Sequence, residues 1–209
     1  MNAIKVMPDQ EKYTMVSDFT RSIDKFALPF FRDQAGEAVE EALIKAWQGG
    51  TIAIPDSATD QEKYEVAYEN FIWKASKVYE LLREELGEES IDQYVQIEID
   101  YLIRENDSLA VKMLSMIKKI SPRLAFNLVA NQLTYQMQWI TPYTIAEKSE
   151  RKLVLDVAHC KVLDYPNSED ICLIGCQRAT TGWVAEQFEV NLDFDRQGQR
   201  CTCTATALN

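Results

Sequence analysis

The spacing of apolar residues changes once along this chain, and that change constrains the fold more than any other feature. In the first two thirds, apolar side chains recur every three or four positions, as at Phe19, Ile23 and Phe26, which indicates amphipathic helices. From residue 152 onward they alternate, as at Leu153 and Leu155, which indicates β-strands. The sequence therefore predicts an α+β protein, with a helical N-terminal region packed on a small C-terminal β-α-β-β module that contains an antiparallel sheet.

The expected elements are separated by turn-forming residues, among them Gly49-Gly50, Gly87 and Pro142. We expect helices over 17–33, 36–48, 61–86, from 90 onward, over 109–120, and from 122 to just before 141. In the module we expect a strand over 152–162, a helix over 169–182, and strands over 186–193 and 200–207. The boundary falls within 141–150. It divides the chain into a helical region, 1–145, and a C-terminal α/β module, 146–209, which form two units or one integrated domain.

The net charge restricts the partners. The chain carries a formal charge of −11, so it offers no dense basic face that could replace counterions on nucleic acid. The same charge argues against docking on an anionic membrane by electrostatics alone. No signal peptide or membrane-length apolar run is visible, and the odd number of cysteines fits no disulfide framework. We therefore expect a cytoplasmic protein with free or ligated thiols, whose partners are proteins or a small ligand.

All five cysteines and the single histidine lie in the last 51 residues. Cys172 and Cys176 share one face of the expected helix, and Cys201 and Cys203 share one face of the expected strand. With Cys160 they could meet and hold zinc or an iron–sulfur cluster. The spacing is not that of a zinc knuckle, and buried cysteines acting as small apolar residues explain it equally well. His159 and Cys160 point to opposite strand faces, so they do not form a Cys–His pair by themselves.

Aromatic and basic side chains near the cysteines suggest a second kind of site. Tyr135 and Trp139 lie four residues apart on the apolar helix, and Trp183 and Arg178 lie near the expected module helix. Such residues suit a flat conjugated ligand with carboxylates, although aromatic stripes are more often core and surface arginines are common. The chain contains no dinucleotide-binding glycine motif, no P-loop and no nucleophile elbow, and one histidine is too few for a di-iron bundle.

The C-terminal stretches VLDVAHCKVL, EDICLIGCQRATTGW and FEVNLDFDRQGQRCTCTATAL give a β-α-β-β tail that ends in Gly-x-x-Cys-x-Cys. This last third of the chain resembles the 4-vinyl reductase domain family. The resemblance implies an α+β fold and the handling of small molecules and tetrapyrroles. The whole chain looks most like cyanobacterial members linked to photosystem II assembly, which implies a bound bilin, photosystem assembly proteins as partners, and a peripheral position at the thylakoid membrane through those partners. The tail is also similar to L-2-amino-thiazoline-4-carboxylate hydrolases, which would make the protein an enzyme.

The leading expectation is a soluble bilin-binding protein, and we assign no catalytic residue. The alternatives are a cysteine-dependent hydrolase of a small heterocycle and an interaction scaffold without a ligand. An exposed apolar helix face would serve a homodimer. The expected binding residues are Cys160, Cys172, Cys176, Cys201, Cys203, His159, Arg178, Trp183, Trp139 and Tyr135.

Overall fold

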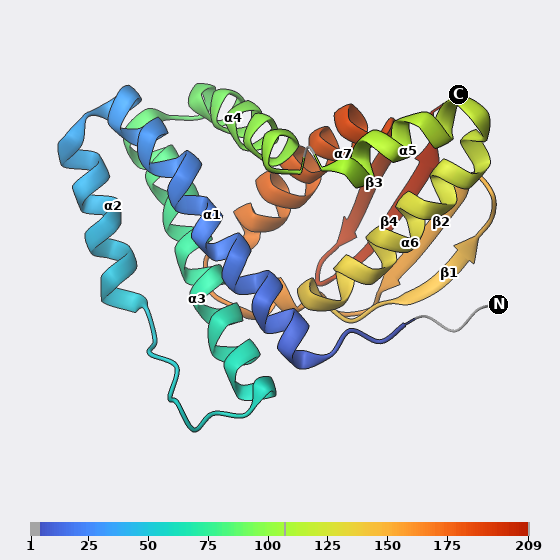
Figure 1. Ribbon diagram of the computed structural model, residues 1–209. Helices are drawn as coiled ribbons and strands as arrows, with labels where there is room; N and C mark the ends of the chain where they lie inside the picture. The colour runs from blue at the N-terminus through green and yellow to red at the C-terminus, as the bar shows by residue number, and fades with distance from the viewer. Residues whose placement is uncertain (1–4, 107, 209) are drawn as a thin grey trace.

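The computed structural model describes residues 5–106 and 108–208, and it confirms the α+β fold class. Helices fill the N-terminal two thirds, and an antiparallel sheet lies in the C-terminal region with a helical segment between its second and third strands (Figure 1). The α-helices are α1 (Asp9–Ala35), α2 (Glu37–Gly50), α3 (Asp60–Leu81), α4 (Glu89–Glu105), α5 (Leu109–Ile120), α6 (Pro122–Ile140) and α7 (Thr181–Phe188). The strands are β1 (Thr144–Lys148), β2 (Lys152–Val157), β3 (Val190–Gln197) and β4 (Arg200–Ala207).

Three shorter segments have other helical geometries. The π-helix η1 (Leu82–Leu86) extends α3, the 3₁₀-helix η2 (Lys161–Asp164) follows β2, and the π-helix η3 (Ile171–Thr180) continues directly into α7. The connection between α2 and α3 ends at Thr59, whose hydroxyl accepts from the backbone N–H of Glu62 while the Glu62 carboxylate accepts from Thr59 N–H. This capping box fixes the start of α3.

The helical core is built on α1 and α3, which lie side by side with α2 outside them (Figure 1). The helix predicted over 17–33 corresponds to α1. The observed helix begins eight residues earlier, at Asp9, and ends two residues later, at Ala35. The helix continues through Pro29, which is unfavourable inside a helix. Phe30 and Phe31, both buried, follow that proline and anchor the last turns in the core. Gly36 then separates α1 from α2 at φ 89°, a conformation that favours glycine.

The sheet has the order β1-β2-β4-β3, and all neighbouring strands are antiparallel. Leu155 on β2 and Phe194 on β3 both pair with Cys203 on β4, so these side chains share one face. That face is apolar and packs on α6 and α7, with Phe126 and Val184 among the contacts. The opposite face carries the threonines of β4 and exposed polar residues of β3.

Two of the predicted strands have wrong bounds, and one observed strand was not predicted. The strand β1 was not predicted, because its sequence TIAEK is short, polar and mostly exposed at the sheet edge. The predicted strand over 152–162 ends at Val157, since the chain turns into η2. The predicted strand over 186–193 begins at Val190, because α7 extends to Phe188 and Glu189 closes it with a left-handed φ of 51°. The module helix was predicted over 169–182, and the helical segment formed by η3 and α7 is longer.

The helix α6 joins the two apolar cores. Its N-terminal half packs on the sheet through Phe126 and Val129, and its C-terminal half inserts Trp139 into the helical core. The Trp139 ring lies 5.9 Å from Phe19 and 5.6 Å from Phe71, measured between ring centroids. Among the described residues, no helix is both long and apolar enough to cross a membrane.

Candidate functional site

The π-helix η3 creates a side-chain arrangement that an α-helix of the same sequence would not give. Residues five apart do not face each other on an α-helix. In η3 they do: Gln177 Nε2 donates to Cys172 Sγ at 3.9 Å, and Thr180 Oγ1 donates to the carbonyl of Gly175 at 2.9 Å. Because π-helices are rare and often occur at functional sites, the widened turn marks this segment as the candidate site.

Two glycines allow η3 and α7 to approach the helical core closely. A Cβ atom on Gly175 would lie 3.1 Å from the hydroxyl of Tyr79 on α3. A Cβ atom on Gly182 would lie 2.4 Å from Cδ1 of Ile99 on α4. The glycines therefore set the distance between the helical core and the candidate site.

The five thiols come from three parts of the fold that meet beside η3. Cys201 and Cys203 face inward on β4, opposite Val157 and Leu155 of β2. Cys160 lies just before η2, where its backbone N–H donates to the carbonyl of Gln199 at 2.8 Å. All five cysteines are free thiols. The other four thiols all influence the pKa of Cys176, so the five lie in one region of the fold.

Burial raises the pKa of every thiol in this group. The pKa of Cys201 and that of Cys203 rise to about 12, and that of Cys176 rises well above its ordinary value. Burial also raises the pKa of Cys160 and of Cys172, and in Cys172 the nearby Arg196 guanidinium opposes this effect. The thiols are therefore protonated near neutral pH, whereas metal ligation and nucleophilic attack both require the thiolate. Across residues 5–106 and 108–208, no group of three or more His, Cys, Asp or Glu side chains could hold a metal ion.

In the described part of the chain, the hydrogen bond of the His159 ring is made with Asp164 and not with a thiol. Its Nε2 lies 2.5 Å from Asp164 Oδ1, and its side chain is 54% exposed. Its carbonyl accepts a hydrogen bond from Thr141 Oγ1 at 3.2 Å. His159 and Cys160 both follow the end of β2, so the strand geometry expected for them is wrong.

The expected aromatic and basic residues are spread over different surroundings. Tyr135 donates from its hydroxyl to Glu11 Oε2 at 2.6 Å, and Trp139 is part of the helical core described above. Trp183 donates from Nε1 to Gln187 Oε1 on the next turn of α7. Arg178 forms an ion pair with Asp92 on α4. These four side chains therefore make separate polar contacts, although Tyr135, Trp139 and Trp183 all adjoin the helical core.

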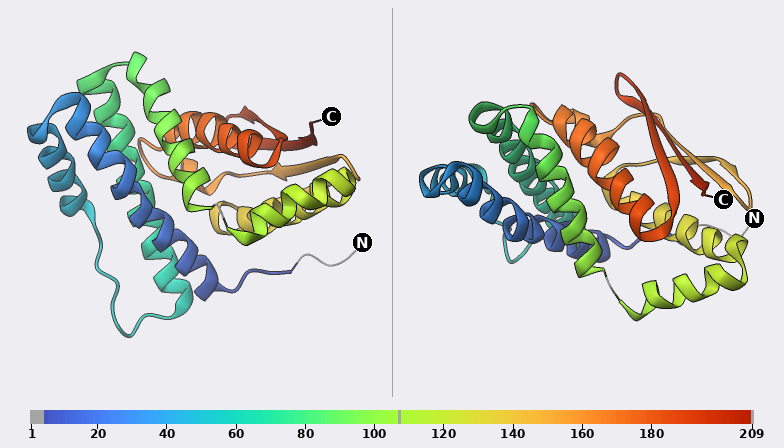
Figure 2. Two further views of the ribbon diagram at one scale, coloured as in Figure 1. Left: turned by 45° about the horizontal axis from the view of Figure 1, so that its top comes forward. Right: turned by 90° about the horizontal axis from the view of Figure 1, so that it is seen from above.

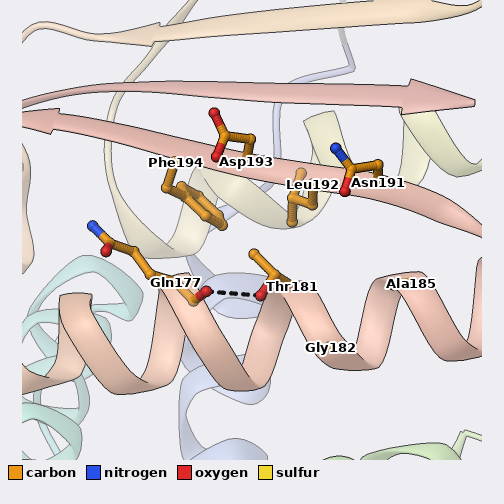
Figure 3. A pocket seen from close by; sticks show the side chains of 8 residues that line it. All are labelled: Gln177, Thr181, Gly182, Ala185, Asn191, Leu192, Asp193 and Phe194. Atoms are coloured by element: carbon orange, nitrogen blue, oxygen red, sulfur yellow. Dashed lines mark hydrogen bonds between the residues drawn. The ribbon is translucent and has the colours of Figure 1, made fainter.

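A pocket of about 360 Å³ lies between the η3–α7 segment and the edge strand β3 (Figure 3). Leu192 and Phe194 point from β3 toward the helix, while Asn191 and Asp193 point to the other side of the strand. Gln177 lines the pocket and also donates to Cys172, so the pocket adjoins this thiol. The remaining lining residues are Thr181, Gly182 and Ala185.

Sequence reasoning missed the pocket residues Gln177, Thr181 and Phe194. The available signal was the run of small and polar residues GCQRATTG, which is unusual for a helix that packs on a sheet. Comparison of the chain with protein-family models, with curated proteins and with solved structures finds no match. The resemblance to the 4-vinyl reductase domain family and the resemblance to the hydrolases therefore both stay predictions.

Proposed function

We propose that this protein binds a flat, conjugated small molecule in the pocket between η3–α7 and β3, with an open-chain tetrapyrrole (a bilin) as the first ligand to test. The observation that carries the proposal is the position of Gln177, which lines the pocket and donates to Cys172 Sγ. A ligand in the pocket would lie one side chain away from a thiol. The same thiol also interacts with Arg196, whose guanidinium is suited to bind a carboxylate.

The chemistry of the pocket supports a ligand with an apolar face and polar edges. Leu192 and Phe194 supply an apolar wall, and Gln177 and Thr181 supply hydrogen-bonding groups on the helix side. The volume of about 360 Å³ lies near the lower end of the range for ligand pockets, about 300–1,000 Å³. It would enclose part of a tetrapyrrole, and the rest of the ligand would extend along the exposed edge strand.

Covalent attachment through Cys172 follows as a second step. The Cys172 thiol would add across an exocyclic double bond of the ligand, so that a carbon–sulfur bond forms and the thiol proton ends on the neighbouring carbon. Because the thiolate is the attacking species and burial raises the Cys172 pKa, attachment would accelerate as the pH rises above neutral.

The test is a titration of the reduced protein with biliverdin and with phycocyanobilin, followed by denaturation in acidic urea. We expect a saturable, red-shifted visible band, and a band that survives denaturation in the unmodified protein and in Cys203→Ser but disappears in Cys172→Ser. Cys203 is the matched control because it is also buried but faces the sheet core. No spectral change in the unmodified protein would reject the ligand proposal, and equal survival of the band in Cys172→Ser would reject the thioether.

A second candidate, docking of an extended peptide, is favoured by the position of β3. This strand lies at the edge of the sheet beside the pocket, and edge strands present backbone N–H and C=O groups that an added strand can pair with. A peptide bound there would compete with the small ligand. The hydrolase alternative has less support, because it requires a thiolate with a lowered pKa and the pKa of every thiol is raised. A role in photosystem assembly rests on the resemblance alone.

A further inference from the structure

The helix α5 is apolar on two sides, and only one of them faces the protein. Val111, Leu114 and Ile117 are half-buried, and Leu114 packs against the core between the sheet and its helices. The opposite side carries Leu109, Met113, Met116 and Ile120, which are 73%, 49%, 58% and 87% exposed. We call these four residues the outer stripe. A helix that is apolar all round is normally covered on both sides, so the outer stripe indicates a missing contact.

The four residues of the outer stripe lie in one row along the axis of α5. Its members are spaced by four, three and four residues, which keeps them on one face of α5. Leu124 and Leu128 on α6 are also exposed, at 50% and 42%, so the α5–α6 hairpin carries half of the large apolar side chains that the described structure exposes. Figure 2 shows α5 at the outer edge of the structure that residues 5–106 and 108–208 form.

The charge around the outer stripe is opposite to that of the whole chain. Residues 108–146 contain no Asp or Glu, although the formal net charge of the protein is −11. The same segment contains Lys112, Lys118, Lys119 and Arg123. Lys118 and Arg123 form ion pairs with Glu189 and Glu150. Lys112 and Lys119 are exposed and lie seven residues apart, on the same flank of the outer stripe.

We propose that α5 docks on an anionic lipid bilayer, with the outer stripe inserted at the boundary between headgroups and acyl chains. A basic amphipathic helix with an exposed apolar face is suited to this position, because its lysines can reach the headgroups while its apolar side chains enter the hydrocarbon. The stripe is convex, and a fluid bilayer surface adapts to it without a preformed groove. A second copy of the chain is a poorer occupant, since an α5–α5 contact would place Lys112 and Lys119 of one copy near those of the other. The inference is independent of the ligand pocket and uses a different surface.

The experiment is sedimentation of the full chain with vesicles of phosphatidylcholine, alone or mixed with phosphatidylglycerol. We expect binding only to the mixed vesicles, and weaker binding at high salt because the attraction is screened. The double variant Met116→Glu plus Ile120→Glu should lose at least about tenfold in partitioning. Lys112→Glu plus Lys119→Glu should lose binding as well, although the outer stripe stays intact.

The matched control is Ile52→Glu plus Ile97→Glu, which adds the same charge at two exposed isoleucines away from α5. It should keep binding within about twofold. Circular dichroism checks that each variant has the helix content of the unmodified chain. The proposal is overturned if the unmodified protein does not sediment with the mixed vesicles, or if both α5 variants bind as the control does. Light scattering that finds a dimer dissociated by the stripe variant, without vesicle binding, would also overturn it and would assign the surface to a second copy.

Discussion

Replacing Glu98 by glutamine should stabilise the protein, and the gain in stability should be larger at neutral pH than in mild acid. Glu98 lies on α4 with 5% of its surface exposed, next to the buried hydroxyls of Tyr79 and Tyr94. Its Oε2 has no hydrogen-bond partner within the described part of the chain. Burial therefore penalises the carboxylate and raises the Glu98 pKa from 4.5 to about 8.

The sign and size of the effect follow from proton linkage. Between the unfolded and folded pKa values, the folded protein keeps a proton on Glu98 that the unfolded protein has released. The free energy of unfolding therefore falls as the pH rises, by about 1.4 kcal/mol per pH unit. This contribution is complete below the unfolded pKa, declines across the interval, and is lost above the folded pKa. From about pH 5.5 to about pH 7.5 the loss amounts to about 3 kcal/mol.

Urea denaturation of reduced protein measures this directly. The Glu98→Gln variant removes the charge and keeps the shape, so it should be more stable than the unmodified protein by about 1.4 kcal/mol at about pH 5.5 and by about 4 kcal/mol at about pH 7.5. Glu84→Gln, at an exposed position of η1, is the control and should show no such change. A Glu98→Gln difference that is the same at both pH values would refute the reasoning.

Three further predictions concern packing and thiol reactivity. Gly50→Ala should destabilise the protein by about 1–3 kcal/mol in thermal unfolding, because its Cβ would lie 2.0 Å from the Trp73 ring, whereas Gly49→Ala meets nothing within 4 Å and should stabilise α2 by up to about 1 kcal/mol. Leu155→Ala should cost about 2–5 kcal/mol in urea unfolding, since this fully buried side chain lies at the centre of the inner sheet face. Iodoacetamide labelling followed by mass spectrometry should find all five thiols slower than a free cysteine near neutral pH, with Cys176 among the slowest, and rapid labelling of any of them would contradict the raised pKa values.

The sequence was sufficient for elements whose pattern is set by burial on one face. The helices and the antiparallel strands β2 and β4 have regular apolar spacing, and the structure confirms their type. It was insufficient where local geometry depends on contacts. The strand β1 has no alternating apolar pattern, since most of its residues are exposed at the sheet edge. The end of α7 at Phe188 depends on packing against the sheet, so the apolar run there was assigned to a strand instead.

The candidate site was predicted only in part, for a related reason. Cysteines can be located from the sequence, and the approach of Cys172, Cys176, Cys201 and Cys203 follows from their elements. The contact between Gln177 and Cys172 could not be predicted, because it depends on the π-helical turn, which has no distinct sequence period. The net charge of −11 is an average over the whole chain, so it likewise gave no indication that the segment 108–146 contains no acidic residue.

A visible absorption titration with bilin, made on a variant whose pocket is filled, tests the central claim most directly. Ala185→Phe places a ring in the pocket, and Ala38→Phe makes the same change at an exposed position of α2. We expect a saturable red-shifted band in the unmodified protein and in Ala38→Phe, and no band in Ala185→Phe. An unchanged band in Ala185→Phe, or no band in the unmodified protein, would contradict the assignment of this pocket as the ligand site.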